Sequence, residues 1–237
     1  METDRQELPA GAMFHENIAD TWSHGYSRQG FGKRLGCFAS ILDRQVVPGA
    51  RWLDLGCGSG VLTGELLKRG ASVLAVDGSP AMLREAQLHV ARTGHSGATW
   101  LQSDVERMDG IRGCTFDGIL CSSVIEYVER PQALLDEACR TLVPGGRLVI
   151  SIPPKHSFVR TVQKMARRVA GIFGVNKFAY LSVSKFEIAL GELEQKFNSA
   201  GFAVDKVTPF DPKLPSVALS VLRPALLIVE AQKKSEQ

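Results

Sequence analysis

The stretch LDLGCGSG, residues 53–60, closes an apolar run that starts at Arg51 and is followed at once by a helical pattern. A chain that turns sharply from a buried strand into a helix needs backbone angles that Gly56 and Gly58 adopt at little cost. Because glycine has no Cβ, a ligand can approach the main chain there, and the free N–H groups of the helix start favour a polar or anionic group. The stretch therefore predicts a nucleotide site at the end of the first strand.

The spacing of the glycines distinguishes two kinds of nucleotide site. Dinucleotide-binding folds use GxGxxG, whereas here Gly60 comes one residue early and Asp54 precedes the loop. The next strand, 72–76, ends at Asp77, 21 residues after Gly56. A carboxylate at that place accepts hydrogen bonds from ribose hydroxyls.

A third acidic residue, Asp104, closes the next predicted strand and is followed by Val105. There a carboxylate can accept from an adenine amino group while the apolar neighbour lies against the ring. Acceptors at the ends of three successive strands predict one adenosine crevice. The alternative is a plain strand-to-helix turn in which Asp77 and Asp104 only cap helices.

Strands alternate with helices over most of the chain, which predicts βαβ units and a parallel sheet with helices on both faces. We expect an α/β, Rossmann-like, doubly wound, mostly parallel seven-stranded sheet in a single domain. Its parts are an N-terminal helical cap (1–48), a cofactor-binding core (49–153), a helical insertion or lid after the fifth strand (154–200) and closing strands (201–237). The expected strands are 51–55, 72–76, 99–102, 116–121, 147–152, 202–207 and 225–231, and the last two expected helices are 157–172 and 185–200.

The amino-acid composition limits which classes of protein this chain can belong to. The 237 residues are 44% hydrophobic, enough for a full core, and the net charge of +3 predicts no nucleic-acid partner. The five cysteines show no metal-ligand spacing, so we expect free thiols, a cytoplasmic location and no catalytic metal. No apolar run reaches the length of a membrane span.

With these residues in view, the chain from Arg51 to Pro153 resembles the class I S-adenosylmethionine-dependent methyltransferases. LDLGCGSG resembles their first motif, AVDGSPAML the second, LQSDVERM the third and FDGILCSSVIEYVERP the fourth, while LVPGGRLVISIP is similar to the turn and fifth strand. The resemblance implies S-adenosyl-L-methionine as the cofactor. The positions that we expect to contact it are Arg34, Asp54, Gly56, Cys57, Gly58, Gly60, Asp77, Gly78, Ser79, Met82, Asp104, Val105, Cys121 and Ser122.

Within that class the chain is most similar to the ubiquinone-biosynthesis O-methyltransferases. Arg34-Leu35-Gly36 resembles a step of theirs whose arginine meets the methionine carboxylate, and an arginine fork suits a carboxylate. Two departures concern the acceptor: Glu126-Tyr127 stands where those enzymes have Glu-His, and the C-terminal third differs. Pro154-Lys155, the basic helix after it and Ala200-Gly201-Phe202 are instead similar to the magnesium-protoporphyrin methyltransferases.

The resulting hypothesis is methyl transfer to a small, lipophilic acceptor, with O-methylation of a phenol or quinone precursor favoured. Carboxyl or N-methylation of a porphyrin or natural product is one alternative; a nicotinamide-dependent oxidoreductase and a non-catalytic binding protein are others. If a base generates the nucleophile, the candidate catalytic residues are His156, Tyr127 and Glu126, with His15, His24 and Tyr26 in the cap as further titratable groups.

The predicted helix 157–172 admits three readings. Phe158, Val162, Met165, Val169 and Ile172 form an apolar side, and Arg160, Lys164 and Arg167 lie on the other side. The helix is a lid over the acceptor, a basic amphipathic helix in peripheral contact with an anionic membrane, or a solvated helix. The sequence leaves the oligomeric state undetermined.

Overall fold

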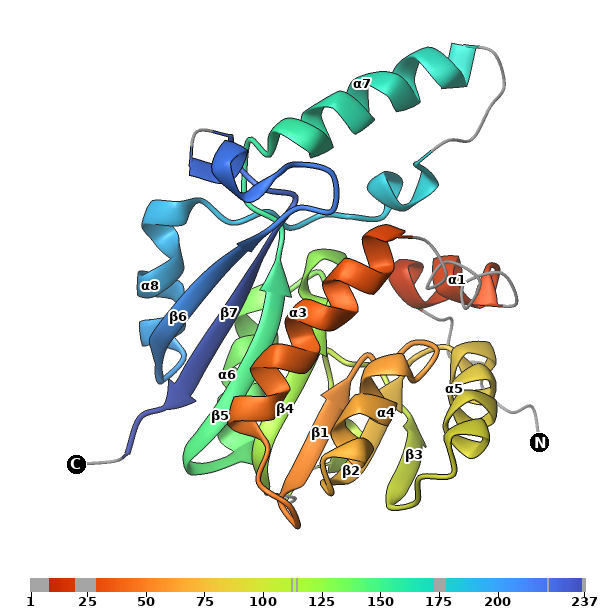
Figure 1. The fold of residues 1–237 in the computed structure, drawn as a ribbon, viewed down its shortest axis with the longest axis vertical. Helices are drawn as coiled ribbons and strands as arrows, with labels where there is room; N and C mark the ends of the chain where they lie inside the picture. Colours follow the sequence, from red (N-terminus) through yellow and green to blue (C-terminus); the bar gives the residue numbers. More distant parts are fainter. Residues whose placement is uncertain are drawn as a thin grey trace.

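The computed structural model describes residues 9–19, 29–111, 113, 115–172, 178–220 and 222–235. Within them, seven strands form one sheet in the order β3-β2-β1-β4-β5-β7-β6. Strands β1 to β5 pair in parallel, and β7 pairs antiparallel with both β5 and β6. The predicted α/β, mostly parallel seven-stranded architecture is confirmed, with one antiparallel hairpin at the β6 edge (Figure 1).

The elements alternate along the chain as predicted. The strands are β1 Arg51–Leu55, β2 Ser72–Asp77, β3 Ala98–Gln102, β4 Phe116–Ser122, β5 Leu142–Ile152, β6 Phe202–Phe210 and β7 Leu226–Lys233. The helices are α1 Ala10–Glu16, α3 Gln29–Gln45, α4 Val61–Lys68, α5 Pro80–Thr93, α6 Pro131–Thr141, α7 Phe158–Ile172 and α8 Leu190–Ser199, with short 3₁₀ turns η2 Asp109–Ile111, η3 Ile125–Tyr127, η4 Ala179–Ser182 and η5 Ser216–Ser220.

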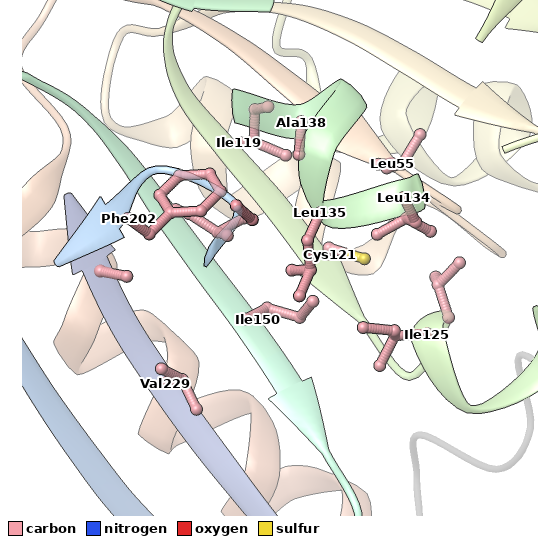
Figure 2. Packing of buried hydrophobic residues seen from close by; sticks show 14 of the residues in the cluster. Leu55, Ile119, Cys121, Ile125, Leu134, Leu135, Ala138, Ile150, Phe202 and Val229 are labelled. Carbon is pink, nitrogen blue, oxygen red and sulfur yellow. The ribbon is translucent and has the colours of Figure 1, made fainter. Parts of the chain in front are cut away.

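Alternating side chains of the parallel strands build a core on each face of the sheet. On one face Trp52 and Leu120 pack with apolar residues of α3, α4 and α5. On the other, Leu53, Ile119 and Ile150 pack with residues of α6 and α8. Figure 2 shows this second core, in which α6 residues lie over β4 and β5. The two layers hold the strand ends at one common edge.

One predicted helix starts later than expected. We expected a helix over 185–200, but α8 begins at Leu190. The residues before Leu190 are extended because their backbone groups bond to other segments. The N–H groups of Lys185 and Phe186 donate to the carbonyl of Glu126, at 2.7 and 3.2 Å, and Ile188 forms a β-bridge with Pro154. The segment thus joins the ends of β4 and β5 instead of forming helical turns.

Helix α7 stands apart from the layers. It lies beyond the carboxyl ends of the parallel strands and projects away from the sheet (Figure 1). Only its first turn is well buried, through Val159 and Arg160. No helix within the described residues is both long and apolar enough to cross a membrane.

Candidate functional site

The glycine loop after β1 has three residues with left-handed backbone angles, at φ values of +72° for Gly56, +53° for Gly58 and +75° for Gly60. A Cβ added at Gly56 would lie 2.2 Å from Cγ2 of Val124, and one at Gly60 would lie 2.8 Å from Cβ of Ala86. A Cβ at Gly58 would meet nothing within 4 Å. Two glycines are therefore required by packing, and the third leaves open space beside the main chain.

Asp77 ends β2 directly against this loop. Its Oδ2 accepts from the backbone N–H of Gly58 and its Oδ1 from that of Ser79, both at 2.9 Å. Burial raises the pKa of Asp77, and the nearby carboxylate of Glu16 adds to the shift. Two hydrogen bonds use about half of the roughly four acceptor sites of a carboxylate. The remaining capacity suits a pair of ligand hydroxyls.

Asp54 lies beneath the loop instead of lining it. Its side chain is 1% exposed and accepts from Oγ1 of Thr63 on α4 at 2.6 Å. Burial raises its pKa to about 7, although the Thr63 hydroxyl acts in the opposite direction. The carboxylate thus joins β1 to α4 and shapes the turn between them.

Two further groups of the loop are buried. Burial raises the pKa of the Cys57 thiol well above its usual value. The hydroxyl of Ser59 is buried and has no hydrogen-bond partner among the described residues. A buried hydroxyl without a partner is unfavourable, so this atom favours a polar ligand group at the loop.

The ends of β2 and β3 bring together the other residues predicted for the adenosine crevice. Ser79 caps α5 by accepting from the N–H of Met82 at 3.0 Å, and Met82 is buried. Asp104 follows β3; its Oδ1 accepts from the N–H of Glu106 at 2.9 Å, and Val105 packs against the core. Asp104 thus caps its own turn, and a carboxylate with one such hydrogen bond keeps acceptor sites for a ligand.

Helix α1 covers this end of the crevice through Glu16, a contact that the sequence did not reveal. Oε2 of Glu16 accepts from the Ser79 hydroxyl at 2.5 Å and from the N–H of Ala81 at 2.9 Å. A Cβ added at Gly78 would lie 3.0 Å from that of Ala12. No motif marks Glu16, because its role depends on how α1 docks on the start of α5.

Arg34 of α3 reaches the ends of β4 and β5. Its Nη2 donates to the hydroxyls of Ser122 at 2.5 Å, Ser123 at 2.8 Å and Ser151 at 3.4 Å. The structure thus brings together Arg34 and Ser122, two of the positions predicted to contact the cofactor, and adds Ser123 and Ser151. Ser123 follows Ser122 directly in the sequence, so that pair of serines could have pointed to it. Three neutral acceptors leave the guanidinium charge available for an anion.

Glu126 and Tyr127, the two candidates after β4, have different surroundings. The Glu126 side chain is 4% exposed, and its Oε2 accepts from Nη1 of Arg160 at 2.9 Å and from the hydroxyl of Ser184 at 3.0 Å. Arg160 also donates from Nε to Glu187 at 3.2 Å. Arg160 lies on the side of α7 opposite the apolar residues, and these carboxylates draw that side inward. Glu126 serves as its counter-ion.

Tyr127 packs under α1. Its ring meets that of His15 edge to face, with centroids 5.1 Å apart, and a Cβ added at Gly11 would lie 2.8 Å from the Tyr127 Cβ. Burial raises the pKa of Tyr127 well above its usual value, and Glu126 adds to the shift. The phenol is therefore neutral near pH 7 and suits hydrogen bonding better than proton removal.

The remaining histidine candidates are less centrally placed. His156 is exposed, in a turn with φ +61° between β5 and α7. Cys121 is fully buried in β4, and burial raises the pKa of its thiol. His24 and Tyr26 lie outside the described residues.

Comparison with known proteins supports the resemblance stated from the motifs. Residues 53–150 match the family described as a methyltransferase domain. The ubiquinone biosynthesis O-methyltransferase of Xylella fastidiosa is 37% identical over 111 residues, 47% of this chain and 45% of that protein. The enzyme of the same name from Xanthomonas oryzae is 32% identical over 152 residues, 60% of this chain and 63% of that protein. The chain thus spans about half to three fifths of these curated relatives.

Solved structures confirm the fold over nearly the whole chain. The magnesium protoporphyrin IX methyltransferase of Synechocystis, solved with bound SAH, superposes with a TM-score of 0.71 at 20% identity and covers 93% of this chain and 96% of its own. An S-adenosylmethionine-dependent methyltransferase of Mesorhizobium loti gives 0.62 at 25% identity, over 81% and 96%. The expected resemblance to S-adenosylmethionine-dependent methyltransferases is confirmed, and so is the fold that it implies.

Proposed function

We propose that this chain, whose residues 53–150 form a methyltransferase domain, is an S-adenosyl-L-methionine-dependent methyltransferase acting on a small, lipophilic acceptor. The observation that carries the proposal is the placement of Asp77 against Gly58, 2.9 Å from its N–H, at the carboxyl edge of the sheet. Ligands of open α/β sheets bind at that edge.

The residues at this edge fit the cofactor. Asp77 has acceptor capacity for two ribose hydroxyls, Gly58 leaves room beside the main chain, and the buried hydroxyl of Ser59 lacks a partner among the described residues. Arg34 supplies a guanidinium for the methionine carboxylate from the opposite side. When bound, S-adenosylmethionine supplies a sulfonium methyl group for in-line displacement by a nucleophile.

The chain's own part is positioning. A neutral thioether leaves well, so alignment and exclusion of water dominate the catalysis and can supply about 7–11 kcal/mol in favourable cases. Tyr127, whose neutral phenol can donate a hydrogen bond, is our candidate for holding the acceptor oxygen. The buried ion pair of Glu126 and Arg160 stabilises the chain next to Tyr127. His156 remains a proposed proton acceptor for a phenol.

For the acceptor we favour a phenol or quinone precursor, because the curated relatives carry that chemistry in their name. A porphyrin carboxyl group is the second candidate, since the magnesium protoporphyrin enzyme superposes on 93% of this chain, a larger share than the quinone relatives match. The cytoplasmic location inferred from the cysteines stays a prediction. Peripheral membrane contact through α7 is argued separately below.

Calorimetric titration with S-adenosylhomocysteine tests the cofactor. We expect binding to the wild-type protein, none of NADH, and a loss of affinity of at least about a hundredfold in Asp77→Ala, because two ribose hydrogen bonds to a charged group are lost. Leu88→Ala, an exposed change on α5, is the matched control. Binding of NADH alone, or unchanged affinity in Asp77→Ala, would contradict the assignment.

Transfer of labelled methyl groups tests the acceptor. Incubation with fractionated cell extract should place label in the lipid fraction if the acceptor is a lipophilic phenol. Tyr127→Phe should then lower kcat more than it raises KM, since it removes a hydroxyl and keeps the ring. Label in water-soluble products only would favour the other acceptor classes.

A further inference from the structure

The apolar side of α7 is turned to solvent. Phe158, Val162, Met165, Val169 and Ile172 recur at spacings of three and four, and their exposed fractions are 48, 49, 61, 57 and 79%. These five residues, the α7 stripe, account for nearly half of the large exposed hydrophobic residues of the described chain. Soluble proteins seldom leave such a contiguous apolar surface without a use.

The polar side chains on the inward side of α7 already have hydrogen-bond and ion-pair partners. These contacts orient the helix with its stripe facing outward. Arg160 is held by Glu126 and Glu187, and Lys164 donates to Glu187 at 2.7 Å. Tyr180 of η4 donates to Gln163 at 2.8 Å. The polar residues thus face the body of the protein. A rotation that buried the stripe would expose the Glu126 carboxylate without its counter-ion.

The charge around the stripe is strongly one-sided. Within α7 itself, residues 158–172, the sequence has four Lys and Arg and no Asp or Glu. Arg168 borders the stripe, and neither Arg167 nor Arg168 forms an ion pair among the described residues. A helix with an apolar stripe, a basic remainder and no acidic residue is typical of segments that lie in the interface of an anionic bilayer.

The segment between Asp211 and Glu230, which contacts the start of α7, is also basic. The N–H of Phe158 donates to the carbonyl of Arg223 at 3.3 Å, and Arg223 donates to the carbonyl of Lys155 at 3.0 Å. Between Asp211 and Glu230 the sequence has two basic residues and no acidic one. Figure 1 shows η5 and the start of α7 together beyond the carboxyl end of β5 and the start of β7.

Charge complementarity selects the occupant of this surface. A second copy docked stripe to stripe would bring together two α7 helices, each with Arg167 and Arg168 unpaired among the described residues and with no acidic residue of its own. Like charges so placed repel, whereas an anionic lipid surface attracts them at roughly 1 kcal/mol per basic residue. The bilayer therefore fits both the apolar and the charged part of the surface.

We propose that α7 docks this protein on an anionic lipid bilayer through its stripe, with the charges of Arg168 beside the stripe and Arg167 behind it adding attraction. The inference rests on the proposed function for its purpose: α7 lies at the same sheet edge as the Asp77 and Arg34 groups, and Arg160 joins its first turn to Glu126, next to Tyr127. Docking turns the acceptor side toward the membrane, where a lipophilic acceptor is dissolved.

Vesicle flotation tests the docking. The wild-type protein should float with vesicles of phosphatidylcholine and phosphatidylglycerol (3:1) and much less with phosphatidylcholine alone. Val162→Ser/Met165→Ser/Val169→Ser should lower the partition coefficient at least tenfold, because the transfer of three apolar side chains is lost. Arg167→Gln/Arg168→Gln should lower it about tenfold on the anionic vesicles only.

The controls use exposed apolar residues elsewhere. Val47→Ser/Leu88→Ser removes side chains that are 67 and 50% exposed and should leave flotation unchanged. Flotation of the α7 triple variant like wild type, or equal flotation on both vesicle types, would overturn the proposal. So would a wild-type dimer that the triple variant dissociates without any change in flotation.

The same proteins separate this proposal from the proposed activity. S-adenosylhomocysteine affinity should be the same in wild type, the triple variant and the control, because the stripe is remote from the Asp77 site. Lost flotation with intact cofactor binding supports the docking surface. Cofactor binding that fails in wild type contradicts the methyltransferase assignment and leaves the flotation result to stand by itself.

Discussion

Two buried carboxylates show how differently the two ends of the site are built. Asp54, under the glycine loop, is 1% exposed and is satisfied by one neutral donor, the hydroxyl of Thr63 nine residues later. Glu126, after β4, is 3% exposed and is satisfied by the guanidinium of Arg160 and the hydroxyl of Ser184, 34 and 58 residues away. Asp54 uses a local, uncharged partner, and Glu126 uses a charge brought in by tertiary structure.

The difference has an energetic consequence. A buried carboxylate without a counter-ion favours its protonated form, which is why the pKa of Asp54 rises to about 7. A buried carboxylate with a counter-ion keeps its charge but depends on it. The cofactor end should therefore respond to pH, and the acceptor end to the loss of either partner of the pair.

The largest effect is expected from breaking the buried pair. Arg160→Met leaves Glu126 charged and without a counter-ion in a buried position, which should cost about 3–5 kcal/mol of unfolding free energy. Denaturation with urea measures it. The double variant Arg160→Met/Glu126→Gln should recover most of the loss, and a double variant as unstable as the single one would show that the pair is not the cause.

The pH dependence of stability should distinguish the cofactor end. Between pH values of about 4 and 7 folded Asp54 holds a proton that the unfolded chain has released, so this stabilisation is present at low pH and is lost as the pH rises toward 7. The loss amounts to at most roughly 4 kcal/mol. Asp54→Asn should flatten that part of the curve of unfolding free energy against pH. Curves of equal slope for wild type and variant would contradict the raised pKa.

The glycine loop offers a smaller, purely steric test. Gly56→Ala places a Cβ 2.2 Å from Cγ2 of Val124 at a positive φ and should cost about 2–3 kcal/mol. Gly58→Ala has open space and should cost only the backbone strain, about 1 kcal/mol, while it lowers S-adenosylhomocysteine affinity. Thermal unfolding and titration measure the two effects. Equal destabilisation by both changes would mean that the Val124 contact is unimportant.

The smallest effect is expected from the exposed member of the charge cluster. Lys164 donates to the same Glu187 as Arg160 but is 49% exposed, so Lys164→Gln should cost less than about 1 kcal/mol. It is the matched control for Arg160→Met on the same helix. If the two variants lose similar amounts of unfolding free energy in urea, burial does not determine how much each of the two cations stabilises the fold.

Local sequence patterns predicted the order of elements around the glycine turn. A strand, a glycine turn and a helix follow one another within residues 51–68, and the order of parallel strands places Asp77 beside that turn. The same patterns did not find Glu16 or Ser151, because each reaches the site from an element that is remote in sequence. Periodicity found the apolar side of α7 but not its direction, since an amphipathic helix has the same pattern whether its stripe faces a core or a membrane.

The sequence by itself determined the order of elements, the glycine turn and the carboxylates at the strand ends, because backbone sterics and strand-to-helix connections act over few residues. Only the tertiary structure decided that Arg160 is buried and that the α7 stripe is exposed. The physical reason is that Glu126 and Glu187, distant in sequence from each other, meet at the first turn of α7 and bind the guanidinium there. Because Arg160 and the stripe lie on opposite sides of α7, the helix that holds Arg160 inward has its apolar side facing outward.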